Sequence, residues 1–267
     1  MEDLIAVRGA RYARERLFDW AAEVGRVTMM LGDAVRLTPT ALRSSRLIIQ
    51  QMAAIGVGSM GLVTVVSMFT GAVAGVQAAY QFSSVVPLKY IGAVIIRSVI
   101  IELGPVITAL VVGGRVGASI AAELGTMKVT EQIDALRAMA INPIRYLVVP
   151  RLIASLIMLP VVTVFADAIA IFGGYVVSVT TVGVSSHTYV VGLKQFFFVK
   201  DLYSGLLKAM IFGGIISTMG CYYGFRTEGG AEGVGQATTR AVVGACVLVL
   251  ISDYLLANFL FRIVFAQ

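Results

Sequence analysis

Long apolar segments separated by short polar ones make up most of the chain after position 46. A helix needs about 20 apolar residues to cross the hydrocarbon core of a bilayer, and five segments reach this length. Because the bilayer core offers backbone polar groups no water to bond with, the pattern predicts an all-α bundle of membrane-spanning helices. The predicted spans are residues 47–79, 91–122, 152–179, 202–225 and 241–265.

The first 46 residues follow another pattern, and residues 3–36 carry too many charges to form a span. From position 17 onward, apolar side chains recur at helical spacing on one face (Leu17, Trp20, Ala21, Val24, Leu31), with Arg16, Asp19, Glu23 and Arg26 on the other. This predicts an amphipathic helix at the membrane interface, ended by Thr38-Pro39. A soluble helix packed on the protein is the alternative. We therefore expect an N-terminal unit of residues 1–46 and a five-span domain of residues 47–267.

A second polar segment interrupts the apolar pattern between the second and third predicted spans. Residues 129–141 predict a short amphipathic helix, closed by Asn142-Pro143, in which Ile133, Leu136 and Ala140 share one face. Charged and amide side chains on the other face remain available to a partner. A polar helix between two spans is suited to coupling the membrane domain to a protein outside the bilayer.

The composition supports an integral membrane protein and indicates its orientation. Only 13% of the 267 residues are charged, against roughly 25% in soluble proteins. Eight arginines lie within the first 46 residues, and further basic residues flank segments 123–151 and 226–240. Basic residues favour the cytoplasmic side, so the pattern places the N-terminus in the cytoplasm and the C-terminus across the membrane. The net charge of +6 reflects this distribution and does not indicate nucleic-acid binding.

Ionisable residues inside predicted spans are costly and are therefore candidates for function. They are Arg97, Glu102, Asp167, Lys208 and Asp253. With a rise of about 1.5 Å per residue, Arg97, Glu102, Lys208 and Asp253 fall near one level in the outer half of the bilayer. We expect Glu102 to pair with Lys208 and Arg97 with Asp253. The group either orients an amphipathic ligand with a charged head, or only fixes the register of the helices.

Motifs of enzyme chemistry are missing or lie in the wrong context. The sequence G-V-G-S-M-G at 56–61 matches a dinucleotide fingerprint, which requires a preceding strand, so close helix packing is the better interpretation, as for G-A-V-A-G at 71–75. The single histidine, His187, lies in a predicted loop of about 20 residues. Since no Gly-Lys dipeptide occurs, the chain has no P-loop, and any ATP hydrolysis belongs to another polypeptide. A kink is expected near Pro105.

Specific motifs in the central fifty residues resemble those of the MlaE/YrbE permease family. They are E-L-G-P-V at 102–106, G-R-V-G-A at 114–118, A-E-L-G-T-M at 122–127, T-E-Q-I-D-A-L at 130–136 and N-P-I-R-Y-L-V-V-P-R at 142–151. Members of this family are the membrane subunits of ABC transporters that move phospholipids or related lipids together with MCE-domain proteins. The resemblance extends over essentially the whole chain after residue 45.

The resemblance implies partners and an activity that residue spacing alone does not. It implies a non-catalytic permease homodimer in a bacterial inner membrane, acting in the maintenance of outer-membrane lipid asymmetry. A cytoplasmic ABC ATPase would bind ATP and Mg²⁺, so this chain would carry no cofactor. A periplasmic MCE-domain hexamer and a small cytoplasmic STAS-type subunit would complete the assembly, with phospholipid as cargo and no nucleic acid.

Two groups of site residues also follow from the resemblance. The coupling helix, at about 128–141, would dock on the ATPase through Lys128, Thr130, Glu131, Gln132, Asp134 and Arg137. The resemblance places Glu102 and Lys208 in or near a lipid cavity between two permease copies, and the depth estimate adds Arg97 and Asp253 to this site. Some relatives carry an arginine directly before E-L-G-P, where this chain has Ile101, so the basic group for a headgroup would come from Arg97.

Two functions of other classes remain as alternatives to the transporter subunit. A stand-alone secondary transporter would use the buried carboxylates as proton sites, although no internal repeat of the kind common in such proteins is evident. A membrane scaffold would use the polar segment at 129–141 only to recruit a cytoplasmic protein. Charged residues within the spans argue against the scaffold.

Overall fold

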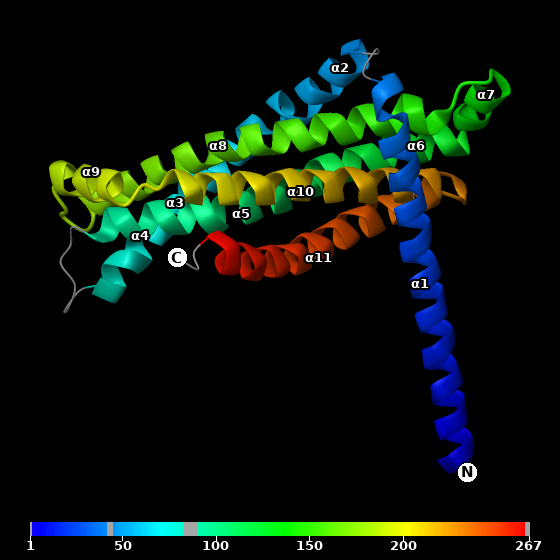
Figure 1. The fold of residues 1–267 in the computed structure, drawn as a ribbon, viewed down its shortest axis with the longest axis horizontal. Coiled ribbons are helices and arrows are strands. Elements are labelled where there is room, and N and C mark those ends of the chain that lie inside the picture. The colour runs from blue at the N-terminus through cyan, green and yellow to red at the C-terminus, as the bar shows by residue number, and fades with distance from the viewer. Residues whose placement is uncertain (1, 42–44, 83–89, 265–267) are drawn as a thin grey trace.

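The computed structural model describes residues 2–41, 45–82 and 90–264, and its regular elements within these ranges are all helical (Figure 1). Element η1 is a 3₁₀ turn, and η2, η3 and η4 are π-helical. In chain order the elements are α1 (Glu2–Ala41), α2 (Ser45–Ile55), η1 (Val57–Ser59), α3 (Met60–Phe82), α4 (Tyr90–Ser98), η2 (Val99–Leu103), α5 (Gly104–Val112), η3 (Gly113–Gly117), α6 (Ala118–Val129), α7 (Gln132–Ala138), η4 (Ile144–Val148), α8 (Val149–Thr180), α9 (Ser186–Gln195), α10 (Val199–Phe225) and α11 (Gly230–Val264).

Five helical segments of the described chain are long and apolar enough to cross a membrane, which confirms the predicted fold class. They are Ser45–Gln81, Tyr90–Val129, Ile144–Thr180, Val199–Phe225 and Gly230–Arg262. The fifth begins earlier than predicted, because the supposed loop at 226–240 turns within a few residues. Gly229 and Gly230 have φ of 85° and 68°, which a glycine adopts readily, and α11 starts there.

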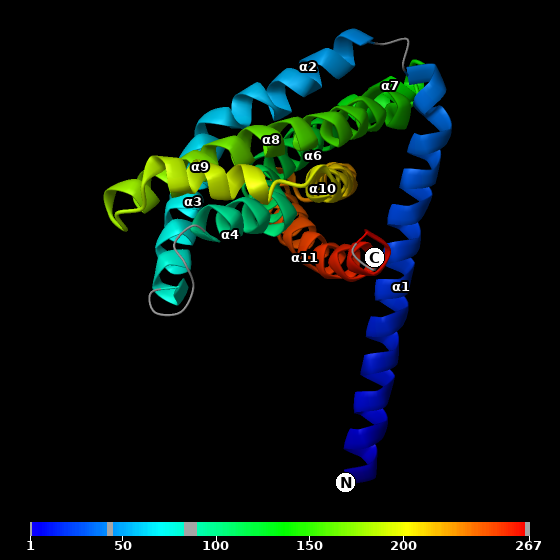
Figure 2. The ribbon, with the colours of Figure 1, turned by 60° about the vertical axis from the view of Figure 1, so that its left-hand side comes forward.

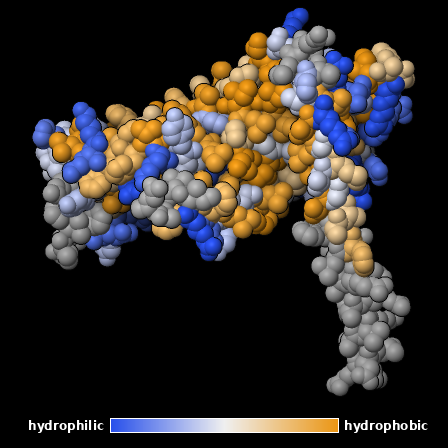
Figure 3. All heavy atoms as spheres, in the orientation of Figure 1, coloured by the Kyte–Doolittle hydropathy of each residue, from blue (hydrophilic) through white to orange (hydrophobic). Residues whose placement is uncertain are grey.

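The bundle has an apolar middle and a polar region at each end (Figure 3). Helix α7 and the start of α11 lie at one end, and α9 and the start of α4 at the other (Figure 1). Successive spans alternate in direction between these ends. The segments 123–151 and 226–240 therefore share an end with α1, as the charge pattern predicted.

Helix α1 lies across the α7 end of the bundle instead of running alongside the spans, as both ribbon views show (Figures 1 and 2). It contacts η4, α8 and α10. This placement is the one expected of a helix in the plane of the membrane surface. The predicted stop at Thr38-Pro39 is wrong, because the helix continues to Ala41. Pro39 falls in the last turn, where its missing N–H removes only a terminal hydrogen bond. The side chains of residues 16, 17, 19 and 20 lie outside the described part.

One of the predicted connections differs in the structure. The region at 180–200 was expected to be a loop, but it contains α9, which begins where the Ser185 hydroxyl accepts a hydrogen bond from the Thr188 amide. His187 is exposed in the first turn of this helix. Most of the connection predicted at 80–90, residues 83–89, lies outside the described residues.

The second span is irregular near Pro105, where a kink was predicted. The π-helical turn η2 directly precedes α5, whose first turn contains Pro105. Proline supplies no amide N–H, and a π turn accommodates the resulting break in the i to i−4 pattern. The irregularity places Glu102 within η2, on the part of the span that faces α10.

Glycines allow α3 and α8 to pack with their backbones in contact. A Cβ atom at Gly71 would lie 1.7 Å from the carbonyl oxygen of Ala170, and one at Gly173 would lie 2.2 Å from that of Met68. The packing interpretation of 71–75 is therefore confirmed. Residues 56–61 run from the end of α2 through η1 into α3, so no strand precedes their glycines and the nucleotide interpretation fails.

Candidate functional site

A buried lysine lies between two carboxylates in the membrane-spanning part of the bundle. Lys208 of α10 places its Nζ 2.7 Å from Oε1 of Glu102 in η2 and 3.0 Å from Oδ1 of Asp253 in α11. The Lys208 side chain is 1% exposed, that of Asp253 19% and that of Glu102 43%. The predicted pairing of Glu102 with Lys208 is confirmed, and Asp253 joins the same cluster.

The Lys208 cluster (Glu102, Lys208 and Asp253) contains a buried charge, on Lys208, and a half-exposed one, on Glu102. Burying an ammonium group in a membrane protein is costly, and opposite charges at contact distance offset that cost. Two carboxylates around one ammonium group leave one formal negative charge unbalanced when all three are ionised. Because Glu102 is half-exposed, this polar group reaches the surface of an otherwise apolar bundle.

Arg97 pairs with Asp201 and not with Asp253 as predicted. Its Nε lies 3.2 Å from Oδ2 of Asp201, and its guanidinium carbon lies 5.6 Å from the centre of the Phe198 ring. The prediction failed because Asp253 pairs with Lys208 instead. Asp201, in the first turn of α10, lies beside Arg97 near the end of α4 and pairs with it. Asp201 was not predicted as a site residue from the sequence. Its position at the start of the fourth span, at the same end of the bundle as Arg97, could have indicated the pair.

Asp167, the remaining intramembrane acid, lies apart from the Lys208 cluster. It is 5% exposed and packs against Gly104, where a Cβ atom would lie 1.7 Å from its Oδ1. No ion pair joins it to Lys208 within the described ranges. Within the described residues, Asp167 therefore makes no ion pair with the four residues predicted to form a site.

Two other charged residues connect helices near the α7 end of the bundle. The Arg115 Nη1 donates to the Ser59 hydroxyl at 2.9 Å and to the Ala54 carbonyl at 3.2 Å, which joins η3 to η1 and α2. The Arg151 Nη2 lies 2.8 Å from Oε2 of Glu123, which joins α8 to α6. These contacts fix the positions of neighbouring helices without the Lys208 cluster.

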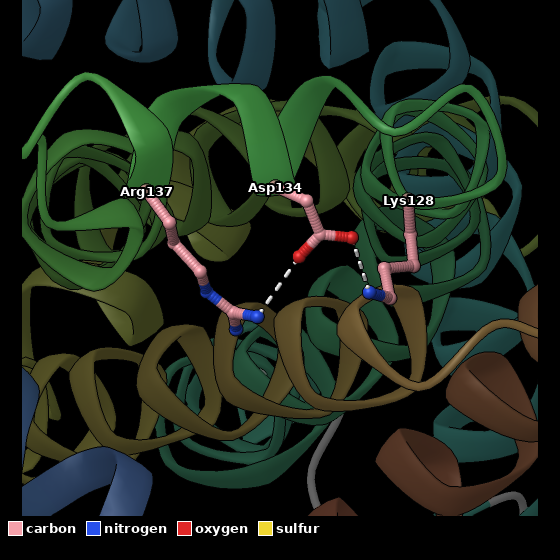
Figure 4. Close-up of polar contacts among 3 residues, drawn as sticks. All are labelled: Lys128, Asp134 and Arg137. Carbon is pink, nitrogen blue, oxygen red and sulfur yellow. Dashed lines mark hydrogen bonds and ion pairs between the residues drawn. The ribbon is translucent and has the colours of Figure 1, made fainter.

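The polar segment after the second span holds a three-residue charge cluster on α6 and α7 (Figure 4). The carboxylate of Asp134 accepts one hydrogen bond from Lys128 Nζ and another from Arg137 Nη1, each at 2.9 Å. Ile133 is fully buried in the core and holds α7 against the bundle. Thr130, Glu131 and Gln132 are exposed beside it, and Gln132 donates to the Thr130 hydroxyl at 3.0 Å. The predicted docking residues therefore form one surface.

Helix α7 is shorter than predicted, since it covers Gln132–Ala138 instead of residues 129–141. Glu131 and Ala140 have φ of 60° and 59°, and these left-handed residues bound the helix on both sides. Hydrophobic periodicity does not reveal such positions. Ala140 is exposed and does not share the buried face of Ile133, so that part of the prediction is wrong.

Acidification is expected to loosen α7. The hydrogen bond from Lys128, with further attraction from Arg137, lowers the pKa of Asp134 below its ordinary value of 3.8. The ionised form is therefore favoured in the folded state, and its stabilising contribution is present above pH 3.8 and lost as the pH falls through the lower pKa of the folded state. Hydrogen exchange of residues 130–141, corrected for intrinsic rates, should be constant from pH 8 to 5 and faster below pH 3.8.

The variant Asp134→Asn serves as the control for this pH dependence. It should show the faster exchange at every pH, with a peptide from the middle of α8 unchanged. If the native protein and the variant exchanged alike at pH 7, Asp134 would not organise α7.

Comparison with known proteins places the chain among membrane permeases. A family model described as permease MlaE matches residues 48–259, a range that contains every candidate residue named above. A probable ABC transporter permease protein of Rickettsia typhi is 45% identical over 217 residues, which cover 81% of this chain and 84% of that protein. The intermembrane phospholipid transport system permease protein MlaE of Haemophilus influenzae is 33% identical over 248 residues, 92% of this chain and 95% of that protein. A chloroplastic protein of Arabidopsis thaliana, TRIGALACTOSYLDIACYLGLYCEROL 1, is 37% identical over 214 residues, 80% and 61% of the two chains.

Proposed function

The chain belongs to the MlaE permease family, and on that basis we propose that it is the membrane subunit of an ATP-binding-cassette transporter for phospholipids or related lipids. The proposal rests chiefly on one observation, the buried Lys208 held between Glu102 and Asp253 among apolar helices. The relative from Haemophilus influenzae bears the name of a phospholipid transport system, which favours this class of cargo. Because the chain lacks a P-loop, ATP would be hydrolysed by a separate subunit.

The Lys208 cluster and Arg97 would receive the lipid headgroup. Arg97 is 42% exposed and could contact a phosphate, while half-exposed Glu102 could contact a headgroup amine or hydroxyl. The acyl chains would lie along α11, whose outward side chains are apolar and 49–69% exposed at Val247, Ile251, Tyr254, Leu255 and Phe259. A second copy of the chain would enclose the ligand between two such faces.

Helix α7 would dock on the ATPase and transmit its motion to the Lys208 cluster. The second span, Tyr90–Val129, is a single helical segment that carries Glu102 near one end and Lys128 at the other. It contains two π-helical turns, η2 and η3, and such turns are frequent at functional sites. A push on α7 would thus reach Glu102 through one continuous element.

The complete assembly would contain two copies of this chain, an ABC ATPase, an MCE-domain hexamer and a small STAS-type subunit. It would lie in a bacterial inner membrane, with α1 and α7 on the cytoplasmic side and the MCE hexamer on the other. In that setting the transporter would serve the lipid asymmetry of the outer membrane. The arginine-rich segment before residue 47 supports this orientation.

Native mass spectrometry of the chain purified from its own membranes tests the proposal directly. The expected result is a complex of two copies with ATPase and MCE-domain subunits and with bound phospholipid. A chain that purifies alone, under conditions that preserve control complexes, and that drives flux with an ion gradient would instead be a secondary transporter. Purification alone without any flux would indicate a scaffold.

Reversing the charge of Glu131 should uncouple ATP hydrolysis from lipid transfer. Glu131 is exposed at the start of α7, so Glu131→Lys should leave the bundle intact and place a repulsive charge on the docking surface. We expect the rate of lipid transfer in reconstituted liposomes to fall about three- to tenfold, which corresponds to a free-energy change of about 0.7 to 1.4 kcal/mol. Glu232→Lys, an equal change on exposed α11 residue Glu232, is the matched control. Full coupled transfer by Glu131→Lys would reject α7 as the docking element.

A further inference from the structure

A cavity of about 670 Å³ lies at the α7 end of the bundle, away from the Lys208 cluster. Its walls come from α1, from the connection between α7 and η4, and from the end of α10. These elements are distant in the sequence and meet because α1 lies across the end of the bundle (Figures 1 and 2). Of the sites proposed above, only the docking surface of α7 shares a residue with this cavity, Arg137.

Three arginines from three different elements line the cavity. They are Arg26 on α1, Arg137 at the end of α7 and Arg226 directly after α10, and all three are exposed. Two of them are held in place, since Arg137 donates to Asp134 and Arg226 donates to the Tyr222 hydroxyl. No acidic residue lines this cavity within the described chain. A group of three guanidinium groups fits a phosphate, which accepts several charge-assisted hydrogen bonds.

Acidic residues do lie close to the cavity, and they leave its charge positive. Asp134 pairs with Arg137 from outside the cavity. An adjoining cavity of about 490 Å³ shares Arg26 and Arg226 and adds Glu23, Glu228 and Arg240. Taken together, Arg26, Arg137, Arg226 and Arg240 carry four positive charges against three negative ones on Asp134, Glu23 and Glu228, and none of these three acids lines the larger cavity.

Apolar side chains form most of the remaining lining of the larger cavity, together with Asn142 and Tyr222. Met30, Ile144 and Phe225 line it beside the arginines, and each of them also packs against the hydrophobic core. The cavity therefore has arginines and apolar side chains in one lining. A soluble anion would use the arginines only, whereas a lipid would use the arginines for its headgroup and the apolar wall for the start of its chains.

We propose that this cavity binds the headgroup of an anionic phospholipid from the membrane leaflet that faces α7. The site is separate from the Lys208 cluster, and its binding does not depend on what that cluster carries. A phosphate bound here would compete with Asp134 for Arg137 and would join α1 to α7. This regulatory consequence rests on the proposed docking function of α7, whereas the binding itself does not.

Binding of short-chain lipids to the full chain in detergent micelles tests the proposal. The probes are dihexanoyl phosphatidylglycerol, the matched phosphatidylcholine and inorganic phosphate. We expect the anionic lipid to bind at least tenfold more tightly than the zwitterionic one. Inorganic phosphate should displace the anionic lipid only at concentrations at least tenfold higher than the lipid itself. Equal competition by phosphate, or equal binding of the two lipids, would overturn the lipid assignment.

Four variants locate the binding. Arg26→Gln and Arg226→Gln should each weaken binding of the anionic lipid about three- to tenfold, and Arg26→Gln decides the matter if Arg226→Gln fails to fold. Arg36→Gln removes an equal charge from exposed α1 outside the cavity and should change binding less than twofold. Arg97→Gln removes only the lipid that the proposed cargo site binds, and the share of binding that Arg26→Gln removes should remain. Binding that depends on Arg97 but not on Arg26 would overturn this inference and leave the transporter proposal intact.

Discussion

Replacing Lys208 by methionine is expected to abolish lipid occupancy and to destabilise the bundle. The variant leaves Glu102 and Asp253 without the ammonium that lies 2.7 and 3.0 Å from them. Removing one partner of a buried ion pair costs about 3 to 5 kcal/mol, and the exposure of Glu102 favours the low end. At about 2 to 4 °C per kcal/mol, the apparent Tm of the purified chain should fall by about 6 to 12 °C. Lipid retained after purification should fall at least about thirtyfold, which corresponds to roughly 2 kcal/mol.

A neutral triple variant separates ligand binding from fixing of helix register. Lys208→Met combined with Glu102→Gln and Asp253→Asn removes all three charges at little change in volume. Replacing a whole buried charge cluster is often close to neutral for stability, so most of the lost Tm should return. Lipid occupancy should stay low, because no charge remains for a headgroup. If both stability and lipid occupancy returned, the cluster would only fix register, and its proposed function as a lipid site would be wrong.

Replacing Gly71 by alanine should strongly destabilise the bundle. The new Cβ would lie 1.7 Å from the Ala170 carbonyl oxygen and 2.4 Å from its carbon, so α3 and α8 must separate. Both atoms belong to backbone, which no rotamer change can move. Overpacking of this kind costs about 1 to 3 kcal/mol and occasionally more, and we expect the upper end of that range. The apparent Tm and the yield of folded protein after size-exclusion chromatography measure the loss.

The control for this variant lies on the same helix. A Cβ atom at Gly61 meets nothing within 4 Å, so Gly61→Ala should be neutral or should stabilise the helix by up to about 1 kcal/mol. The two alanine variants should therefore shift Tm in opposite directions. A Gly71→Ala protein as stable as Gly61→Ala would contradict the close contact of α3 with α8.

The depth of each charged residue along its span was predictable from the sequence, but the neighbouring helix toward which its side chain points was not. The constant rise of a helix placed Glu102 and Lys208 at one level, and the structure confirms that pair. The same calculation placed Arg97 and Asp253 at that level, yet Arg97 contacts Asp201 instead. Which of two groups at similar depth will meet depends on how the spans are ordered around the bundle, and hydropathy carries no information on that order.

Local backbone conformation also limited how well the ends of α7 could be predicted from the sequence. Periodicity located α7 through Ile133, but the left-handed residues Glu131 and Ala140 shortened it at both ends. Apolar periodicity does not record the sign of φ at a non-glycine residue. The cavity arginines Arg26 and Arg226 were likewise visible only as basic residues near the membrane, because their common site exists only once α1 crosses the end of α10.

The sequence by itself determined that this protein is an α-helical membrane protein with five spans and a polar insertion. The hydrocarbon core of a bilayer requires long apolar helices, and charged side chains are costly within it. The sequence also indicated the family, through motifs in the second span and in the polar insertion that follows it. Only the tertiary structure decided that Lys208 forms ion pairs with both Glu102 and Asp253, and that Arg97 pairs with Asp201. It also decided that three arginines line a cavity next to α1. Hydrophobic transfer is a property of each segment alone, whereas ion pairs and cavities depend on how segments pack.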